Sequence, residues 1–147
     1  PGAIATALRA KAGPARIYLV TDAMSTVGSE LSTITLGGRT ITRGGGKLTL
    51  DDGTLAGSDL DMITAIRFMI DTVSIARDEA LAMASSYPAM ALGIDRTHGR
   101  IGPGARADFV HLSDALAIRD VYIGGLRQDF PSQDFPSQDL AAIGGTP

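Results

Sequence analysis

Hydrophobic positions change their spacing along the chain, and each change predicts a different kind of element. Residues 3–12 carry apolar side chains at helical spacing until Gly13-Pro14 ends the pattern. Residues 16–21 (RIYLVT) form a run of β-branched and aromatic side chains without strict alternation, which is typical of a strand covered on both faces in a parallel sheet. The opening of the chain therefore predicts a helix and then a buried strand, with Asp22 at the carboxyl end of that strand.

Glycines divide the next stretch into short strand-like runs. Residues 32–36, 39–43 and 47–50 are separated by a pair and then by a triplet of glycines. Glycine supplies the positive φ angles that tight hairpin turns require. We expect antiparallel hairpins here, forming an insert at about residues 30–51 between the buried strand and the next helix.

Helical spacing returns after residue 53. Ser58 followed by Asp61 has the spacing of a capping box at the start of a helix that continues to about Val73. A second helix is predicted over residues 77–86, because two acidic residues in its first turn oppose the helix dipole and Pro88 forces a break. One further helical turn is expected after that break.

The last third of the chain predicts a small β unit and then a tail. Residues 106–112 and 118–123 read as two strands, with glycine-rich turns before the first and after the second. Residues 129–138 consist of a five-residue sequence, DFPSQ, repeated in tandem, with too few apolar side chains to bury. We expect residues 128–147 to be a disordered tail.

The composition is that of an ordinary globular protein. The chain has 147 residues, of which 44% are hydrophobic and 20% charged, so it accounts for one domain or part of one. The net charge of −3 leaves no basic excess for binding nucleic acid or an anionic membrane, and no apolar run is long enough to span a bilayer. We therefore expect a cytoplasmic protein without either partner. Because the chain starts at Pro1 within a helical pattern, we expect it to be part of a longer polypeptide.

The inventory of metal-binding side chains is small. Cysteine is absent, and the two histidines, His98 and His111, lie 13 positions apart, outside the short spacings by which one element presents paired ligands. We therefore expect no self-sufficient metal site in this chain.

Asp22 is the candidate catalytic residue. The alternation of strand and helix indicates an α/β barrel, and in such barrels the carboxyl ends of the strands carry the active site. An aspartate at that position could equally start a turn without any catalytic role, so the pattern alone leaves both interpretations open.

Three short sequence motifs give information that the spacing of hydrophobic residues does not. Residues 19–23 read LVTDA, residues 53–58 read GTLAGS, and residues 99–110 read GRIGPGARADFV. In order and spacing the chain resembles the N-acetylglucosamine-6-phosphate deacetylases of the amidohydrolase superfamily, from about residue 3 to residue 125. The third motif is shared across the superfamily, whereas the first two point to the deacetylases.

This resemblance implies a fold. The expected class is α/β: the C-terminal part of a (β/α)8 TIM-type barrel over residues 1–93, with the hairpin insert, and part of a small β-sandwich over residues 94–127. A complete barrel takes roughly 250 residues, so this chain cannot contain one. The exposed strand edges and apolar helix faces of such a part would need covering, by a second copy in a homo-oligomer or by the missing barrel portion.

The resemblance also implies site residues and an activity. Asp22 corresponds to the catalytic aspartate, which acts as general base toward a metal-bound water and then passes the proton to the leaving amine. The residues that correspond to the loop lining the sugar site are Leu55, Ala56, Gly57 and Ser58. The implied reaction removes the acetyl group of N-acetylglucosamine 6-phosphate, an amino-sugar phosphate, to give glucosamine 6-phosphate and acetate.

The family's metal ligands and phosphate-binding residues would lie upstream of this chain. A divalent metal, zinc or similar, is thus expected in the intact enzyme, and the isolated chain is expected to be inactive. Two alternatives stay open. One is another amidohydrolase, a cyclic amidase or deaminase, and the other is a non-catalytic fragment that associates with a complementary chain.

Overall fold

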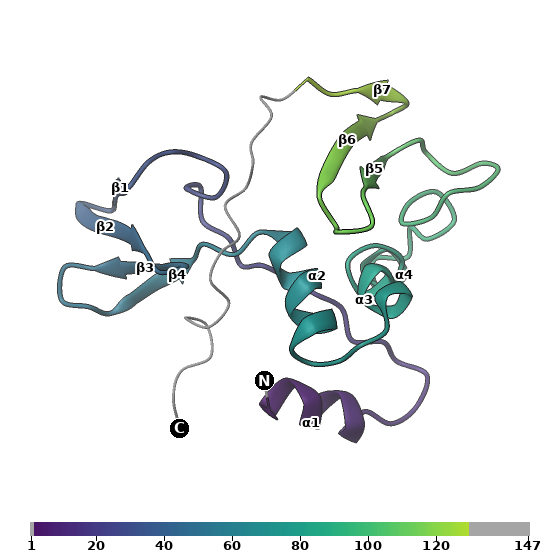
Figure 1. Ribbon diagram of the computed structural model, residues 1–147, viewed down its shortest axis with the longest axis horizontal. Helices are drawn as coiled ribbons and strands as arrows, with labels where there is room; N and C mark the ends of the chain where they lie inside the picture. The colour runs from purple at the N-terminus through teal and green to yellow at the C-terminus, as the bar shows by residue number, and fades with distance from the viewer. Residues whose placement is uncertain (1, 130–147) are drawn as a thin grey trace. The chain divides into compact units, whose positions relative to one another are not determined.

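The computed structural model describes residues 2–129, which divide into two units (Figure 1). One unit comprises residues 20–68, and the other comprises residues 2–19 together with residues 69–129. The tandem repeat and the predicted tail lie outside the described residues from position 130 onward.

A four-stranded antiparallel sheet dominates the unit of residues 20–68. Its strands follow one another in chain order: β1 (Thr33–Leu36), β2 (Arg39–Gly44), β3 (Lys47–Leu50) and β4 (Leu55–Ser58). The predicted hairpins are confirmed, and the glycine pair between β1 and β2 has φ angles of 57° and 75°, as a two-residue turn of this kind requires. Leu48 and Ile41 form the buried centre of the sheet, with 0% and 3% of their surface exposed.

Strand β4 differs from the prediction, which had these residues opening a helix. Lys47 pairs with Ser58 and Leu48 with Gly57, so the GTLAGS motif continues the sheet. The reason lies in the preceding turn: Gly53 donates its N–H to the Leu50 carbonyl and reverses the chain, which carries Leu55 back along β3.

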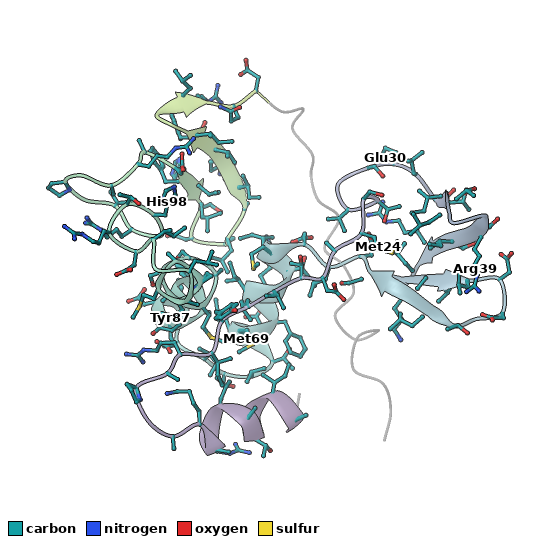
Figure 2. The ribbon with its side chains drawn as sticks, turned by 180° about the vertical axis from the view of Figure 1, so that it is seen from behind. Met24, Glu30, Arg39, Met69, Tyr87 and His98 are labelled. Carbon is teal, nitrogen blue, oxygen red and sulfur yellow. The ribbon has the colours of Figure 1, made fainter. Side chains whose placement is uncertain are left out.

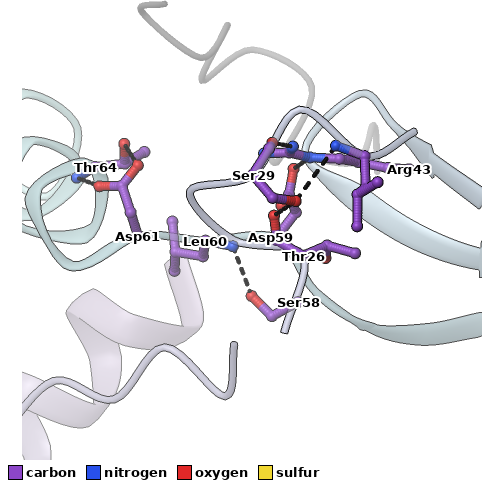
Figure 3. Close-up of polar contacts among 9 residues, drawn as sticks. Thr26, Ser29, Arg43, Ser58, Asp59, Leu60, Asp61 and Thr64 are labelled. Atoms are coloured by element: carbon purple, nitrogen blue, oxygen red, sulfur yellow. Dashed lines mark hydrogen bonds and ion pairs between the residues drawn. The ribbon is translucent and has the colours of Figure 1, made fainter. Parts of the chain in front are cut away.

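Helix α2 (Met62–Asp71) confirms the predicted helix over a shorter span. Its cap is Asp61, whose Oδ1 accepts the Thr64 N–H at 2.7 Å and whose Oδ2 accepts the Thr64 hydroxyl at 2.9 Å. The prediction that Ser58 caps this helix is wrong, because Ser58 belongs to β4 and its Oγ accepts the Leu60 N–H instead (Figure 3).

The other unit contains three short helices: α1 (Gly2–Ala10), α3 (Arg77–Met83) and α4 (Ser86–Ala91). The break that we predicted at Pro88 lies earlier, between α3 and α4. Pro88 is the third residue of α4, in the first helical turn, where a missing N–H leaves no intrahelical hydrogen bond unmade.

No strand forms over residues 16–21, contrary to prediction. The segment is irregular, with Val20 70% exposed, and its Leu19 N–H donates to the Met83 carbonyl at 2.9 Å. A parallel strand must pair with strands that are distant in sequence, and residues 2–129 supply none to this segment.

A second antiparallel sheet follows the helices, in the order β5 (Phe109–Leu112), β6 (Ile118–Ile123), β7 (Leu126–Arg127). The first two strands confirm the predicted β unit, and the third is an addition formed by the tight turn after β6. Phe109 and Tyr122, opposite each other on β5 and β6, stack with ring centroids 4.5 Å apart. Among residues 2–129, no helix has the length and hydrophobicity needed to cross a bilayer.

Candidate functional site

Asp22 lies at the start of the loop that leads from the irregular segment into β1. Its backbone has a φ of 51°, in the left-handed region that only a few per cent of non-glycine residues adopt. The side chain is exposed, and none of residues 2–129 forms a hydrogen bond or ion pair with its carboxylate. A carboxylate without a local partner is open to a ligand.

The chain brings Asp22 next to the predicted substrate-binding segment. Ala23 forms an isolated parallel bridge with Ser58, and the Met24 N–H donates to the Ser58 carbonyl at 3.1 Å. The first two motifs of the sequence, 31 positions apart at Asp22 and Gly53, are thereby joined through the last residue of β4. Asp22 therefore lies near the Ser58 end of β4, whereas Leu55 lies at the opposite end of that strand.

Within β4, Gly57 allows Met24 to lie directly against the strand (Figure 2). A Cβ at Gly57 would be 2.3 Å from the Met24 sulfur and 2.6 Å from its Cγ, far inside van der Waals contact. Glycine at position 57 leaves room for the Met24 side chain beside the strand. Of its neighbours, Leu55 is 65% exposed, while Ala56 and Ser58 are half-buried.

A polar cluster behind this site was not predicted from the sequence. Arg43 on β2 donates from Nε to Asp59 Oδ2 at 2.6 Å and from Nη1 to the Ser29 carbonyl (Figure 3). The Asp59 side chain is only 5% exposed. The alternation of β2 was a signal that could have revealed it, because Arg43 lies two residues after the buried Ile41 and so faces the same side of the sheet.

Residues 2–129 contain no group of three or more His, Asp or Glu side chains arranged to hold a metal ion. His111 instead contacts Asp120 across β5 and β6, with Nδ1 3.0 Å from Oδ2, while Arg127 donates to Asp120 Oδ1 at 2.7 Å. The hydrogen bond from His111, reinforced by the one from Arg127, holds the pKa of Asp120 below its ordinary value. The described side chains thus do not fit a metal centre of their own.

An open pocket of about 340 Å³ lies at the other end of the four-stranded sheet, away from Ser58. It is polar and is lined by Gly38, Arg39, Thr40, Leu50, Asp51 and Asp52. Neither Asp22 nor β4 borders it, so this pocket is separate from the candidate site.

Known proteins match this chain over most of its length. The N-acetylgalactosamine-6-phosphate deacetylase of Escherichia coli O157:H7 is 37% identical over 115 residues, which are 78% of this chain and 30% of that protein. The N-acetylglucosamine-6-phosphate deacetylase of Bos taurus is 36% identical over 126 residues, which are 85% of this chain and 30% of that protein.

Solved structures agree with these relatives. The crystal structure of N-acetylglucosamine-6-phosphate deacetylase from Pasteurella multocida superposes with a TM-score of 0.79 at 28% identity, covering 86% of this chain and 33% of that one. The chain thus spans about a third of the length of each of these three proteins. The profile of the amidohydrolase family matches residues 4–127, and the chain belongs to that family.

Proposed function

We propose that this chain supplies the catalytic aspartate and part of the substrate-binding surface of a deacetylase acting on an N-acetylhexosamine 6-phosphate, with N-acetylglucosamine 6-phosphate as the first candidate. The observation that carries the proposal is the position of Asp22. Its carboxylate is exposed and unpaired among the described residues, and the next residue, Ala23, forms a bridge with Ser58 in the motif that marks the deacetylases.

The chemistry required of Asp22 is a proton transfer in each direction. Water attacks the carbonyl carbon of the acetamide, and the carboxylate accepts the proton that the water loses. The C–N bond then breaks, and the same carboxyl group delivers that proton to the departing amine nitrogen, which leaves acetate and the free amino sugar. One side chain can perform both transfers because its charge is restored at the end of each cycle.

The amidohydrolase family is generally dependent on divalent metal ions. Because the described residues offer no set of ligands, we place any metal ligands in the part of the polypeptide that this chain does not contain. The contribution of this chain is therefore the proton-transferring group and its support.

Leu55, Ala56, Gly57 and Ser58 are our candidates for the surface beside the sugar. The exposed Leu55 side chain offers an apolar face, and the backbone of a strand with small side chains allows a ligand to approach closely. We do not assign the phosphate to this segment, because Arg43, the cation beside it, is already paired with the Asp59 carboxylate.

In this proposal, residues 1–93 form the last part of a TIM-type barrel and residues 94–127 contribute strands to a small β-sandwich. The remaining barrel, or a second copy in a homo-oligomer, would then cover the exposed side chains of Tyr18 and Val20. A phosphorylated sugar does not cross membranes unaided, so we place the activity in the cytoplasm.

A second candidate substrate is N-acetylgalactosamine 6-phosphate, because the E. coli relative that acts on it by name is as similar to this chain as the bovine enzyme. The two sugars differ only in the orientation of the C4 hydroxyl. Turnover of both substrates by the full-length enzyme decides between them. Cleavage of cyclic amides or nucleobases in preference to either would instead favour another amidohydrolase activity.

The decisive test of the site is Asp22→Asn in the full-length enzyme. We expect kcat to fall by about 10² to 10⁴, the usual contribution of a general acid–base, while metal content measured by mass spectrometry stays unchanged. Asp51→Asn, an exposed carboxylate in the turn after β3, is the matched control and should keep full activity. Near-normal turnover by Asp22→Asn would remove the basis of the proposal.

A further inference from the structure

The loop that begins at Asp22 is held to the sheet at two points, one near each end. Near its start, the Met24 N–H donates to the Ser58 carbonyl at 3.1 Å. Near its end, the Ser29 carbonyl accepts the Arg43 Nη1. Arg43 also binds Asp59, the residue directly after Ser58. The pair Ser58-Asp59 therefore holds the start of the loop directly and its end through Arg43.

Within the loop, short-range hydrogen bonds connect these two points. The Thr26 carbonyl accepts both the Ser29 N–H at 3.0 Å and the Ser29 hydroxyl at 2.8 Å, and the Val27 N–H donates to the Met24 carbonyl at 3.1 Å. Thr26 itself is completely buried. A displacement of Ser29 would consequently be transmitted through Thr26 to Met24, two residues from Asp22.

Arg43 can hold two acceptors at once because its guanidinium group is planar and presents several N–H donors in fixed directions. Its side chain is 24% exposed and that of Asp59 is 5% exposed, so the pair is largely removed from solvent (Figure 3). In such surroundings an ion pair is weakly screened and its geometry is well defined. Arginine can donate to Asp59 and to the Ser29 carbonyl in fixed directions, whereas lysine would offer a single point charge.

We propose that Arg43, together with Asp59, is a positioning residue for Asp22. It fixes the loop of residues 22–29 against the end of β4, and so keeps the Asp22 backbone in its left-handed conformation near Ser58. The inference rests on the proposed function, in which Asp22 transfers the proton. It assigns no contact between Arg43 and the substrate.

The variants are made in the full-length enzyme. Arg43→Met would leave the Asp59 carboxylate buried without its cation, so we pair it with the double variant Arg43→Met/Asp59→Leu, which removes both charges. Arg43→Lys keeps the charge but cannot reach both acceptors in the same way. Arg39→Met is the matched control, because Arg39 is an exposed arginine on the same strand.

We expect kcat of the double variant to fall by about 10- to 100-fold, because a small misplacement of a catalytic group has effects of that order. KM should change by less than about threefold, since Arg43 does not touch the substrate. Arg43→Lys should recover part of the lost kcat, and Arg39→Met should match the parent enzyme.

Hydrogen exchange of the amides provides a readout that is independent of activity. The Met24 and Ser29 amides should exchange at least about tenfold faster in the double variant, while the Leu48 amide in the centre of the sheet stays protected. Equal loss of protection at Leu48 would reveal a merely structural role and overturn the proposal. So would unchanged exchange at Met24 and Ser29, whatever happens to kcat.

The two proposals fail in different ways. If Asp22→Asn keeps its activity, the proposed function is wrong even when the loop amides respond as expected. If Asp22→Asn is inactive while the double variant keeps its kcat and its amide protection, the function stands and the positioning role of Arg43 is overturned.

Discussion

The four-stranded sheet and the segment of residues 16–21 differ in where their pairing partners lie. Every ladder of the sheet joins strands that are neighbours in sequence between Thr33 and Ser58. Residues 16–21 have equally strand-like side chains, yet they join no ladder among the described residues. Antiparallel strands can be connected by two-residue turns, whereas a parallel strand depends on elements that are far away in sequence. The difference teaches that pairing between neighbouring segments forms from local sequence alone, whereas a strand-like segment without a distant partner stays irregular.

The largest effect that could test this comparison comes from the centre of the sheet. Leu48→Ala should lower the free energy of unfolding by about 3 kcal/mol, because it removes a completely buried side chain and leaves a cavity. Val20→Ala, at a 70% exposed position in the irregular segment, should change it by less than about 0.5 kcal/mol. Urea denaturation of this chain measures both, and a comparable loss in the two variants would show that residues 16–21 are packed after all.

A smaller effect on stability is expected at the contact between Met24, which follows the irregular segment, and β4. Gly57→Ala should cost about 1.5 kcal/mol, because the new methyl group displaces the flexible Met24 side chain from β4. Adding Met24→Ala should restore most of that loss, so the two substitutions should be strongly non-additive in a double-mutant cycle measured by urea denaturation. Simple additivity would mean that Met24 does not lie against β4.

Thr26→Val should move the stability in the opposite direction, by about 1 kcal/mol. The Thr26 hydroxyl is buried, and no hydrogen bond reaches its Oγ1 from the described residues. A buried hydroxyl without a partner is destabilising, and a methyl group of the same shape removes that penalty. Thermal unfolding should therefore shift to higher temperature. A destabilised variant would indicate that the hydroxyl has a partner.

The smallest effect concerns the second sheet, whose pairing is also local. Because His111 and Arg127 lower the pKa of Asp120 in the folded chain, the contribution of this carboxylate is complete above its ordinary unfolded value and is lost as the pH falls through the lowered one. Asp120→Asn should therefore be less stable than the parent near neutral pH and similar to it in strong acid. Urea midpoints measured across that range give the test, and a constant difference at every pH would contradict it.

The elements that could be predicted from the sequence are those whose signals and partners are close together. The glycine pair at Gly37-Gly38 defined the β1–β2 hairpin, and the period of apolar residues defined α2. The assignment of β4 failed because residues 53–58 were interpreted as the entry into a helix that begins at Ser58. A hairpin and a helix entry share the same small and polar residues, and only the pairing with β3 distinguishes them.

The site residues that belong to a sequence motif could be predicted, whereas those brought together only by packing could not. Asp22 and residues 55–58 were named from motifs, and their proximity depends on a bridge between residues 35 positions apart, Ala23 and Ser58. The Arg43–Asp59 pair was missed because neither residue belongs to a motif, and charged side chains on strands usually face solvent. The alternation of β2 places Arg43 on the same side as Ile41, but the pattern of that strand does not identify Asp59 as its partner.

The left-handed backbone conformation at Asp22 determines which substitution removes the carboxylate charge without disturbing the backbone. Asparagine adopts this conformation as readily as aspartate, whereas alanine would add backbone strain to the loss of the carboxylate, and glycine would loosen the chain at the same point. An alanine variant would consequently report a mixture of chemistry and conformation. The amide is the one replacement for which a lost reaction can be attributed to the missing negative charge.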